Sequence, residues 1–215
     1  MSLNAELRAF HEARRLEIPA EIRQVMQRAD AELAASDQAD RALATGAQAP
    51  RFTLPSATGE AVALDQLLDR GPVVLTFYRG SWCPYCNLAL RSLQQHHGEI
   101  TDRGAHLVAV SPQVPDESLS LAEKHALDFT VLSDVGSETA TAYGLAFELP
   151  DDLAAAYDKL GIALDRVNGG HPRTLPVPAT YVIDQGGVIR WAFADTDYTK
   201  RAEPADILTA LDALR

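Results

Sequence analysis

The 215-residue chain has two cysteines, Cys83 and Cys86, which stand three positions apart in the segment FYRGSWCPYC. Two thiols at this spacing can close a disulfide across one helical turn and can be reduced again. A Cys-x-x-Cys pair beside a strand and a helix is typical of thiol redox chemistry in a reducing compartment. We therefore predict a redox-active dithiol, in which one thiolate attacks the substrate and the other thiol resolves the adduct.

Two other uses of the cysteine pair are weaker. A structural disulfide is unusual in a reducing compartment. A zinc site would need two further ligands, and the chain has no second Cys-x-x-Cys. His96 and His97 follow about ten residues later, roughly 15 Å along the same helix, which is too far to share a metal with the cysteines. We expect neither a metal nor a cofactor.

The residues around the cysteines predict a strand, a turn and a helix. The apolar run 73–78 is typical of a buried strand, and leucines at helical spacing in 87–97 indicate an amphipathic helix. Pro84 suits the first position of that helix, which makes Cys83 the expected N-cap. The helix dipole lowers the pKa of a thiol at that end. On this argument Cys83 is the attacking cysteine.

The rest of the chain alternates between predicted strands and helices. The expected strands are 52–54, 61–64, 105–110, 129–132, 181–184 and 188–193. The expected helices are 65–68, capped by Asp65; 116–125; 137–143, capped by Ser137; 151–160; and 205–214. Such alternation indicates an α/β fold with a mostly parallel sheet covered by helices. The stretch 149–176 breaks the rhythm and is predicted to be irregular after its helix, which often marks a functional loop.

Residues 1–45 are predicted to form a helical N-terminal extension to a main domain at 46–215. A helical pattern covers 3–35 and is interrupted at Pro19. It carries an apolar stripe that must be covered, either by the main domain or by a second copy in a homodimer. The stripe comprises Leu3, Leu7, Phe10, Ile22 and Val25.

The chain has a formal net charge of −11 and a pI of about 4.9. An acidic surface repels nucleic acid and anionic membranes, so we expect neither as a partner. The N-terminus carries charged residues throughout its first 20 positions, unlike a signal peptide, and no apolar stretch is long enough to span a membrane. We expect a soluble cytoplasmic protein.

Two segments far apart in the sequence resemble the thioredoxin fold. One is the strand that ends in WCPYC, and the other is Val177-Pro178-Ala179-Thr180, which enters a later strand. The resemblance implies a mixed central sheet flanked by helices. It also implies that Pro178 forms a cis-proline loop facing the cysteine pair. By the same resemblance Cys83 is expected to be exposed, with Cys86 partly buried one turn further on.

From about residue 47 to 215 the chain resembles the peroxiredoxins of the alkyl hydroperoxide reductase and thiol-specific antioxidant (AhpC/TSA) family. The resemblance rests on GAQAPRFTLP at 46–55, on the Phe77-Tyr78 strand end and on ATYVID at 179–184. It implies reduction of hydroperoxides by a cysteine cycle, with recycling by a thioredoxin-type or glutathione-type thiol donor.

The active-site segment departs from the family pattern at three positions. Aligned on Phe77-Tyr78, Cys86 takes the place of the peroxidatic cysteine and Cys83 takes the place of the family's threonine. Arg79 stands where the family has a proline, and Pro178 stands where it has an arginine. The resemblance therefore favours Cys86 as the attacking residue, whereas the helix-end argument favours Cys83.

Three functions follow from these observations. The first is a thiol peroxidase. The second is a thioredoxin-like disulfide reductase, which the replacements at Cys83 and Pro178 favour. The third is a binding module without catalysis, in which both thiols would titrate near the ordinary value of about 8.5 and react slowly.

The candidate site residues come from the segments already quoted. Arg79 at the strand end would lower the pKa of a thiol and bind developing negative charge. The aromatic residues beside the cysteines and the later proline loop would contact the substrate. His171, in the irregular stretch near Pro178, is the histidine closest to this loop in the sequence. The predicted catalytic residues are Cys83, Cys86 and Arg79, and the predicted substrate-binding residues are Trp82, Tyr85, Val177 and Pro178.

Overall fold

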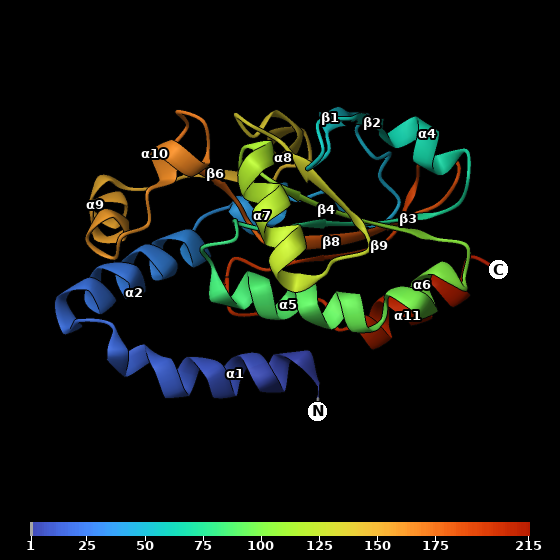
Figure 1. Cartoon of the computed structure of the whole chain (residues 1–215). Helices are drawn as coiled ribbons and strands as arrows, with labels where there is room; N and C mark the ends of the chain where they lie inside the picture. Colours follow the sequence, from blue (N-terminus) through green and yellow to red (C-terminus); the bar gives the residue numbers. More distant parts are fainter. Residues whose placement is uncertain (1) are drawn as a thin grey trace.

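A five-stranded mixed sheet forms the centre of the computed structural model, which describes residues 2–215 (Figure 1). In spatial order its strands are β5 (Thr130–Ser133), β4 (His106–Ser111), β3 (Val73–Phe77), β8 (Ala179–Ile183) and β9 (Ile189–Ala194). β3, β4 and β5 pair in parallel, whereas β8 is antiparallel to both β3 and β9. The predicted thioredoxin-like mixed sheet is confirmed. The prediction of a mostly parallel sheet holds for strand direction, because only β8 runs against the other four strands.

Helices cover both faces of this sheet, and two small sheets lie at its margins (Figure 1). The small sheets pair β1 (Thr53–Pro55) with β2 (Ala61–Ala63) and β6 (Ala146–Glu148) with β7 (Thr174–Pro176). The helices that follow the N-terminal extension are α4 (Leu64–Leu68), α5 (Pro84–Gln95), α6 (His97–Thr101), α7 (Pro115–His125), α8 (Glu138–Ala142), α9 (Asp151–Lys159), α10 (Leu164–Val167) and α11 (Pro204–Asp212). None of the helices within residues 2–215 is both long and apolar enough to cross a membrane.

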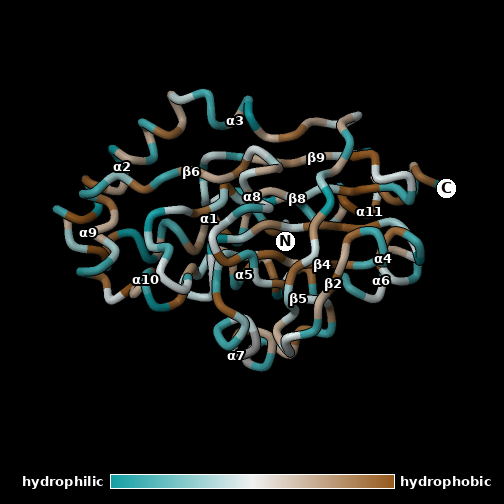
Figure 2. The backbone as a smooth tube through the Cα atoms, turned by 90° about the horizontal axis from the view of Figure 1, so that it is seen from above, coloured by the Kyte–Doolittle hydropathy of each residue, from teal (hydrophilic) through white to brown (hydrophobic). Residues whose placement is uncertain are grey.

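Alternating side chains of β3 bury on opposite faces of the sheet, as the pleat of a strand requires. Leu75 and Phe77 belong to the core shared with α4 and α8, whereas Val74 belongs to the core shared with α5 and α11. Figure 2 shows the hydrophobic stretches gathered along the central strands, with hydrophilic stretches on α7 and α9. The continuous apolar run at 73–78 thus reflects a strand covered on both sides.

The stretch 149–176 has its predicted helix, and residues 168–173 form no helix or strand, as expected, but two short elements were not predicted, α10 and β7. It contains α9, α10 and β7. These elements share a small core of their own, which includes Leu153, Tyr157, Leu164, Val167 and Leu175. Short helices packed around one apolar cluster carry too little periodicity to be recognised in the sequence.

Of the two predicted helix caps, Ser137 is at the N-cap position without capping through its side chain, and Asp65 is not at the cap. Ser137 precedes α8 in the left-handed region, with φ of 60°, and its side chain makes no cap hydrogen bond. The carboxylate of Asp134 caps the helix instead, because it accepts hydrogen bonds from the backbone N–H groups of Thr139 at 3.0 Å and Ala140 at 2.8 Å. α4 begins one residue before Asp65, which therefore lies inside the helix.

The N-terminal extension forms α1 (Leu3–Arg14), the 3-10 turn η1 (Arg15–Glu17), α2 (Ala20–Ala35) and α3 (Gln38–Arg41). α1 packs on α5, and α2 packs on α9 (Figure 1). Leu3 and Leu7 are 4% and 0% exposed and belong to the same core as α5 and α11. The main domain therefore covers the part of the apolar stripe that Leu3 and Leu7 form.

Leu7→Ala is expected to destabilise the chain by about 2–5 kcal/mol, because it leaves a cavity under a fully buried side chain. Urea unfolding of the two proteins measures the difference. Leu16→Ala is the matched control, because Leu16 is 68% exposed and its loss is expected to cost less than about 0.5 kcal/mol. Equal effects of the two substitutions would mean that α1 does not share the core in solution.

Candidate active site

The cysteine pair lies where β3 gives way to α5, as predicted. Cys83 is the N-cap of α5, in an extended conformation with φ of −89°, and Pro84 occupies the first turn. Gly80 has φ of +141°, and a Cβ there would lie 2.5 Å from the indole nitrogen of Trp82. The loop between strand and helix therefore requires a glycine to let the indole lie against the backbone.

Both cysteines are reduced and buried, with Cys83 2% and Cys86 0% exposed. The prediction of an exposed Cys83 is wrong, because aromatic side chains from distant segments cover the end of the helix. Tyr85 packs edge-on against Phe10 of α1 and against Tyr198, each at a centroid distance of 5.4 Å. The Tyr85 hydroxyl also lies 2.8 Å from Nδ1 of His11.

The two thiols differ in pKa, and in the opposite sense to the helix-end prediction. Burial, the hydrogen bond to Cys86 and the negative charge of Cys86 raise the pKa of Cys83. Burial also acts to raise the pKa of Cys86, but the hydrogen bond from the Cys83 thiol, the charge of Arg201 and the Arg79 backbone N–H hold it well below its usual value. These directions favour Cys86 as the thiolate of the pair, with Cys83 as its hydrogen-bond donor.

Arg201 is the side chain that contacts the thiolate directly. It is 6% exposed, and one guanidinium nitrogen donates to Cys86 Sγ at 3.1 Å. Its other terminal nitrogen donates to the carbonyl oxygens of Tyr198 and Lys200, both at 2.6 Å. The guanidinium is thus held by its own loop in a position where its charge favours the ionised sulfur.

The N-terminal extension fixes the backbone of Arg201. Asn4 of α1 accepts a hydrogen bond from the Arg201 backbone N–H at 3.0 Å and donates to the Arg201 carbonyl at 2.7 Å. Glu203 accepts from the backbone N–H groups of Leu3 and Asn4 at 2.9 and 2.8 Å. The start of α1 and the loop before α11 are therefore joined directly beside the cysteines.

Arg79 is 4% exposed and is enclosed by three aromatic rings. Its guanidinium lies 4.9 Å from the ring centroid of Trp82, 5.5 Å from that of Tyr157 and 4.8 Å from that of Tyr198. It also donates to the Tyr157 hydroxyl. No described carboxylate forms a salt bridge with it, so it places a positive charge beside the cysteines that the aromatic faces stabilise.

Val177 and Pro178 are buried and lie with Arg79 around one cavity. The predicted cis bond is wrong, because no peptide bond within residues 2–215 is cis. The two residues join β7 to β8. The Val177 N–H donates to the Leu145 carbonyl at 2.9 Å, and the Pro178 carbonyl accepts from Asp195 at 3.4 Å. These two backbone hydrogen bonds hold the segment between Leu145 and Asp195.

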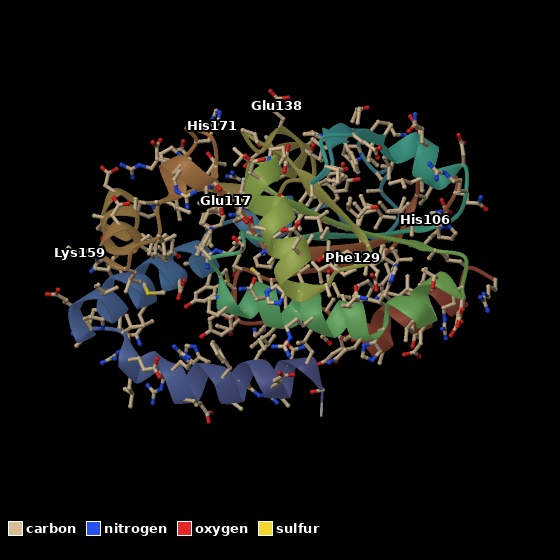
Figure 3. The ribbon with its side chains drawn as sticks, in the orientation of Figure 1. His106, Glu117, Phe129, Glu138, Lys159 and His171 are labelled. Atoms are coloured by element: carbon tan, nitrogen blue, oxygen red, sulfur yellow. The ribbon has the colours of Figure 1, made fainter. Side chains whose placement is uncertain are left out.

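The structure does not bring His171 to the cysteines. It is exposed, on the loop after α10 (Figure 3). Its ring lies 3.7 Å from where a Cβ on Gly136 would stand. Trp82 and Tyr85, by contrast, lie in the wall around Cys83 and Arg79.

Sequence reasoning missed Arg201, Tyr157 and Tyr198. The loop that carries Arg201 follows the last strand and has no motif that links it to the cysteines. A buried arginine leaves no trace in the pattern of apolar residues. The absence of the family's arginine at Pro178 was the one signal available, because an active site without it needs another cation.

The comparisons with known proteins agree with this architecture. A model of the AhpC/TSA family matches residues 45–192. Peroxiredoxin Q of Oryza sativa subsp. japonica is 28% identical over 148 residues, which cover 69% of this chain and 58% of the rice protein. The chain thus spans little more than half the length of that relative. The thiol-disulfide oxidoreductase ResA of Halalkalibacterium halodurans is 32% identical over 109 residues, which cover 50% of this chain and 61% of that protein.

Among solved structures, the peroxidoxin BcpB of Mycobacterium tuberculosis superposes with a TM-score of 0.64 and 24% identity. The match covers 80% of this chain and 99% of that one. At this identity the likeness establishes the shared fold and nothing further. The fold is that of the thioredoxin-like peroxiredoxins.

Proposed function

The chain belongs to the AhpC/TSA family, and we propose that it reduces hydroperoxides through a dithiol–disulfide cycle of Cys86 and Cys83. The observation that carries the proposal is the thiolate environment of Cys86. Its sulfur accepts a hydrogen bond from the buried Arg201 at 3.1 Å, and the charge of Arg79 also lowers its pKa. A buried sulfur held as a thiolate by two cations can act as a nucleophile, whereas a cysteine that only packs in a core needs no such charge.

In the first step the Cys86 thiolate attacks the terminal oxygen of the hydroperoxide. An S–O bond forms and the O–O bond breaks, which gives a sulfenic acid on Cys86 and, after uptake of one proton, an alcohol or water. The sulfur is oxidised by two electrons and the peroxide is reduced by two. Arg79 and Arg201 would stabilise the negative charge that develops on the leaving oxygen.

In the second step the Cys83 thiol attacks the sulfenic acid sulfur. A disulfide forms between the two cysteines, and water leaves with the Cys83 proton. Two thiol groups of a donor of the thioredoxin or glutathione type then reduce the disulfide and are themselves oxidised to a disulfide. The high pKa of Cys83 keeps it protonated in the resting state, where it supports the Cys86 thiolate.

Reduction of protein disulfides is the second candidate, and the match to a thiol-disulfide oxidoreductase favours it. The burial of both sulfurs argues against it, because a disulfide in a folded partner must reach the attacking atom. A small peroxide meets this requirement more easily.

The test is a direct comparison of the two substrates with the full chain. With dithiothreitol or a thioredoxin system as donor, we expect steady consumption of hydrogen peroxide and slow reduction of insulin. Fast insulin reduction without peroxide consumption would instead identify a disulfide reductase. Inactivity toward both, with two slowly alkylated thiols, would identify a binding module.

A further inference from the structure

A cavity of about 170 Å³ lies between the N-terminal extension and the main domain, with Arg79 in its wall. The helices on its two sides, α2 and α9, pack against each other (Figure 1). Its apolar lining includes Ala29, Leu33, Phe147, Leu153, Val177 and Pro178. α2 lies entirely before residue 45, where the family match begins, so this wall is an addition to the family domain.

We propose that this cavity holds the organic group of an alkyl hydroperoxide, and that α2 determines which groups fit. The inference rests on the proposed peroxidase function and deepens it. Hydrogen peroxide has no organic group and needs no such cavity. A tertiary alkyl or aryl hydroperoxide does.

The size and lining of the cavity fit an apolar group. An apolar protein cavity of about 150 Å³ holds a benzene ring. The present cavity is of that order. Burying such a group against aliphatic and aromatic side chains contributes about 25 cal/mol per Å² of apolar surface.

Arg79 gives the cavity its polar end. Its side chain is almost fully buried, and its Nε has no hydrogen-bond partner among the described residues. A buried N–H without a partner is costly unless a ligand accepts from it. The same residue acts on both sulfurs through its charge and donates its backbone N–H to Cys86. A peroxide oxygen bound at Arg79 would therefore lie at the cysteine side of the cavity.

The charged residues of the cavity favour an uncharged substrate. Asp30, Glu32 and Glu148 also line it. Burial, opposed by Arg79 and reinforced by Asp197, raises the pKa of Asp30 to about 6, so its carboxyl is mostly ionised at neutral pH. Three carboxylates disfavour an anion such as a fatty-acid hydroperoxide. A neutral hydroperoxide with an apolar body meets no such repulsion.

Leu33→Trp tests the proposal, because it fills the cavity from α2 without touching either cysteine. We expect kcat/KM for cumene hydroperoxide to fall at least about tenfold, while kcat/KM for hydrogen peroxide stays within about twofold. The hydrogen peroxide rate on the same sample reports that the site is folded. Gln24→Trp is the matched control, because Gln24 is exposed on the same helix and lines none of the cavities described.

Three results would overturn the inference alone. They are an equal loss toward both peroxides, no loss toward cumene hydroperoxide, and a wild-type chain that reduces hydrogen peroxide but not cumene hydroperoxide. A wild-type chain that reduces neither would instead overturn the proposed function, and the inference with it.

Discussion

Cys86→Ser is expected to abolish peroxide reduction, with kcat/KM at pH 7 falling by at least about a thousandfold, because the hydroxyl that replaces the thiolate is no nucleophile at that pH. Cys83→Ser is expected to act differently. It leaves the Cys86 thiolate in place, so one equivalent of peroxide is consumed per chain and the sulfenic acid accumulates. Stopped-flow peroxide consumption and the mass of the intact chain separate the two effects.

Cys83→Thr is the matched control, because it restores the threonine that the family carries at this position. A hydroxyl there can donate to the Cys86 sulfur as the Cys83 thiol does. We expect the first oxidation to stay within about tenfold of the wild-type rate, whereas the internal disulfide can no longer form. If Cys83 becomes oxidised in Cys86→Ser, and Cys83→Ser is inactive, then the attacking and resolving roles are reversed.

The sequence was sufficient for those features of the site that depend on local order. The position of Cys83 at the start of α5 follows from an apolar run, a proline and spaced leucines within one segment. The other strands of the central sheet are likewise predicted from apolar runs elsewhere in the chain. The strand before the cysteines and the strand after Pro178 pair as neighbours, β3 with β8.

The identity of the thiolate could not be read in the same way, because it depends on groups far away in the chain. Arg201 is 115 residues from Cys86. In the sequence it stands among charged residues that look like a surface loop. Tyr157 lies in a helix that was predicted, but the sequence pattern does not indicate that its ring contacts Arg79. The dipole argument for Cys83 was physically sound, yet burial and the charge of Cys86 outweigh it.

The departure from the family pattern at Pro178 also becomes interpretable. In the sequence the loss of an arginine there looked like a move toward thioredoxin chemistry. In the structure Pro178 has a trans bond and lines an apolar cavity, while Arg201 supplies a guanidinium to Cys86 from another loop. The guanidinium thus comes from Arg201 and not from position 178, where Pro178 leaves room in the cavity for an apolar group. This arrangement favours a peroxidase with an altered pocket over a disulfide reductase.

Arg201→Gln is expected to lower the rate of Cys86 oxidation at pH 7 by about a hundredfold, comparable to the loss of one preorganised charged donor. Without the guanidinium, burial raises the pKa of Cys86 toward or above the ordinary value of about 8.5. The reactive thiolate then forms only at higher pH. The variant should therefore recover as the pH rises to about 9, whereas the wild-type rate should already have reached its plateau near neutral pH. Oxidation by hydrogen peroxide, followed through tryptophan fluorescence between about pH 5 and 9, gives both profiles.

Asn4→Ala provides the second arm, because it keeps the Arg201 charge and removes the two hydrogen bonds that fix its backbone. We expect a shift of the pH profile in the same direction but smaller, since the guanidinium stays near the sulfur without being held. A structural role of Asn4 alone would lower the unfolding temperature and leave the midpoint of the pH profile unchanged. If Arg201→Gln also keeps the wild-type midpoint, the thiolate does not depend on Arg201, and Arg79 with the Cys83 thiol must be sufficient to hold Cys86 ionised.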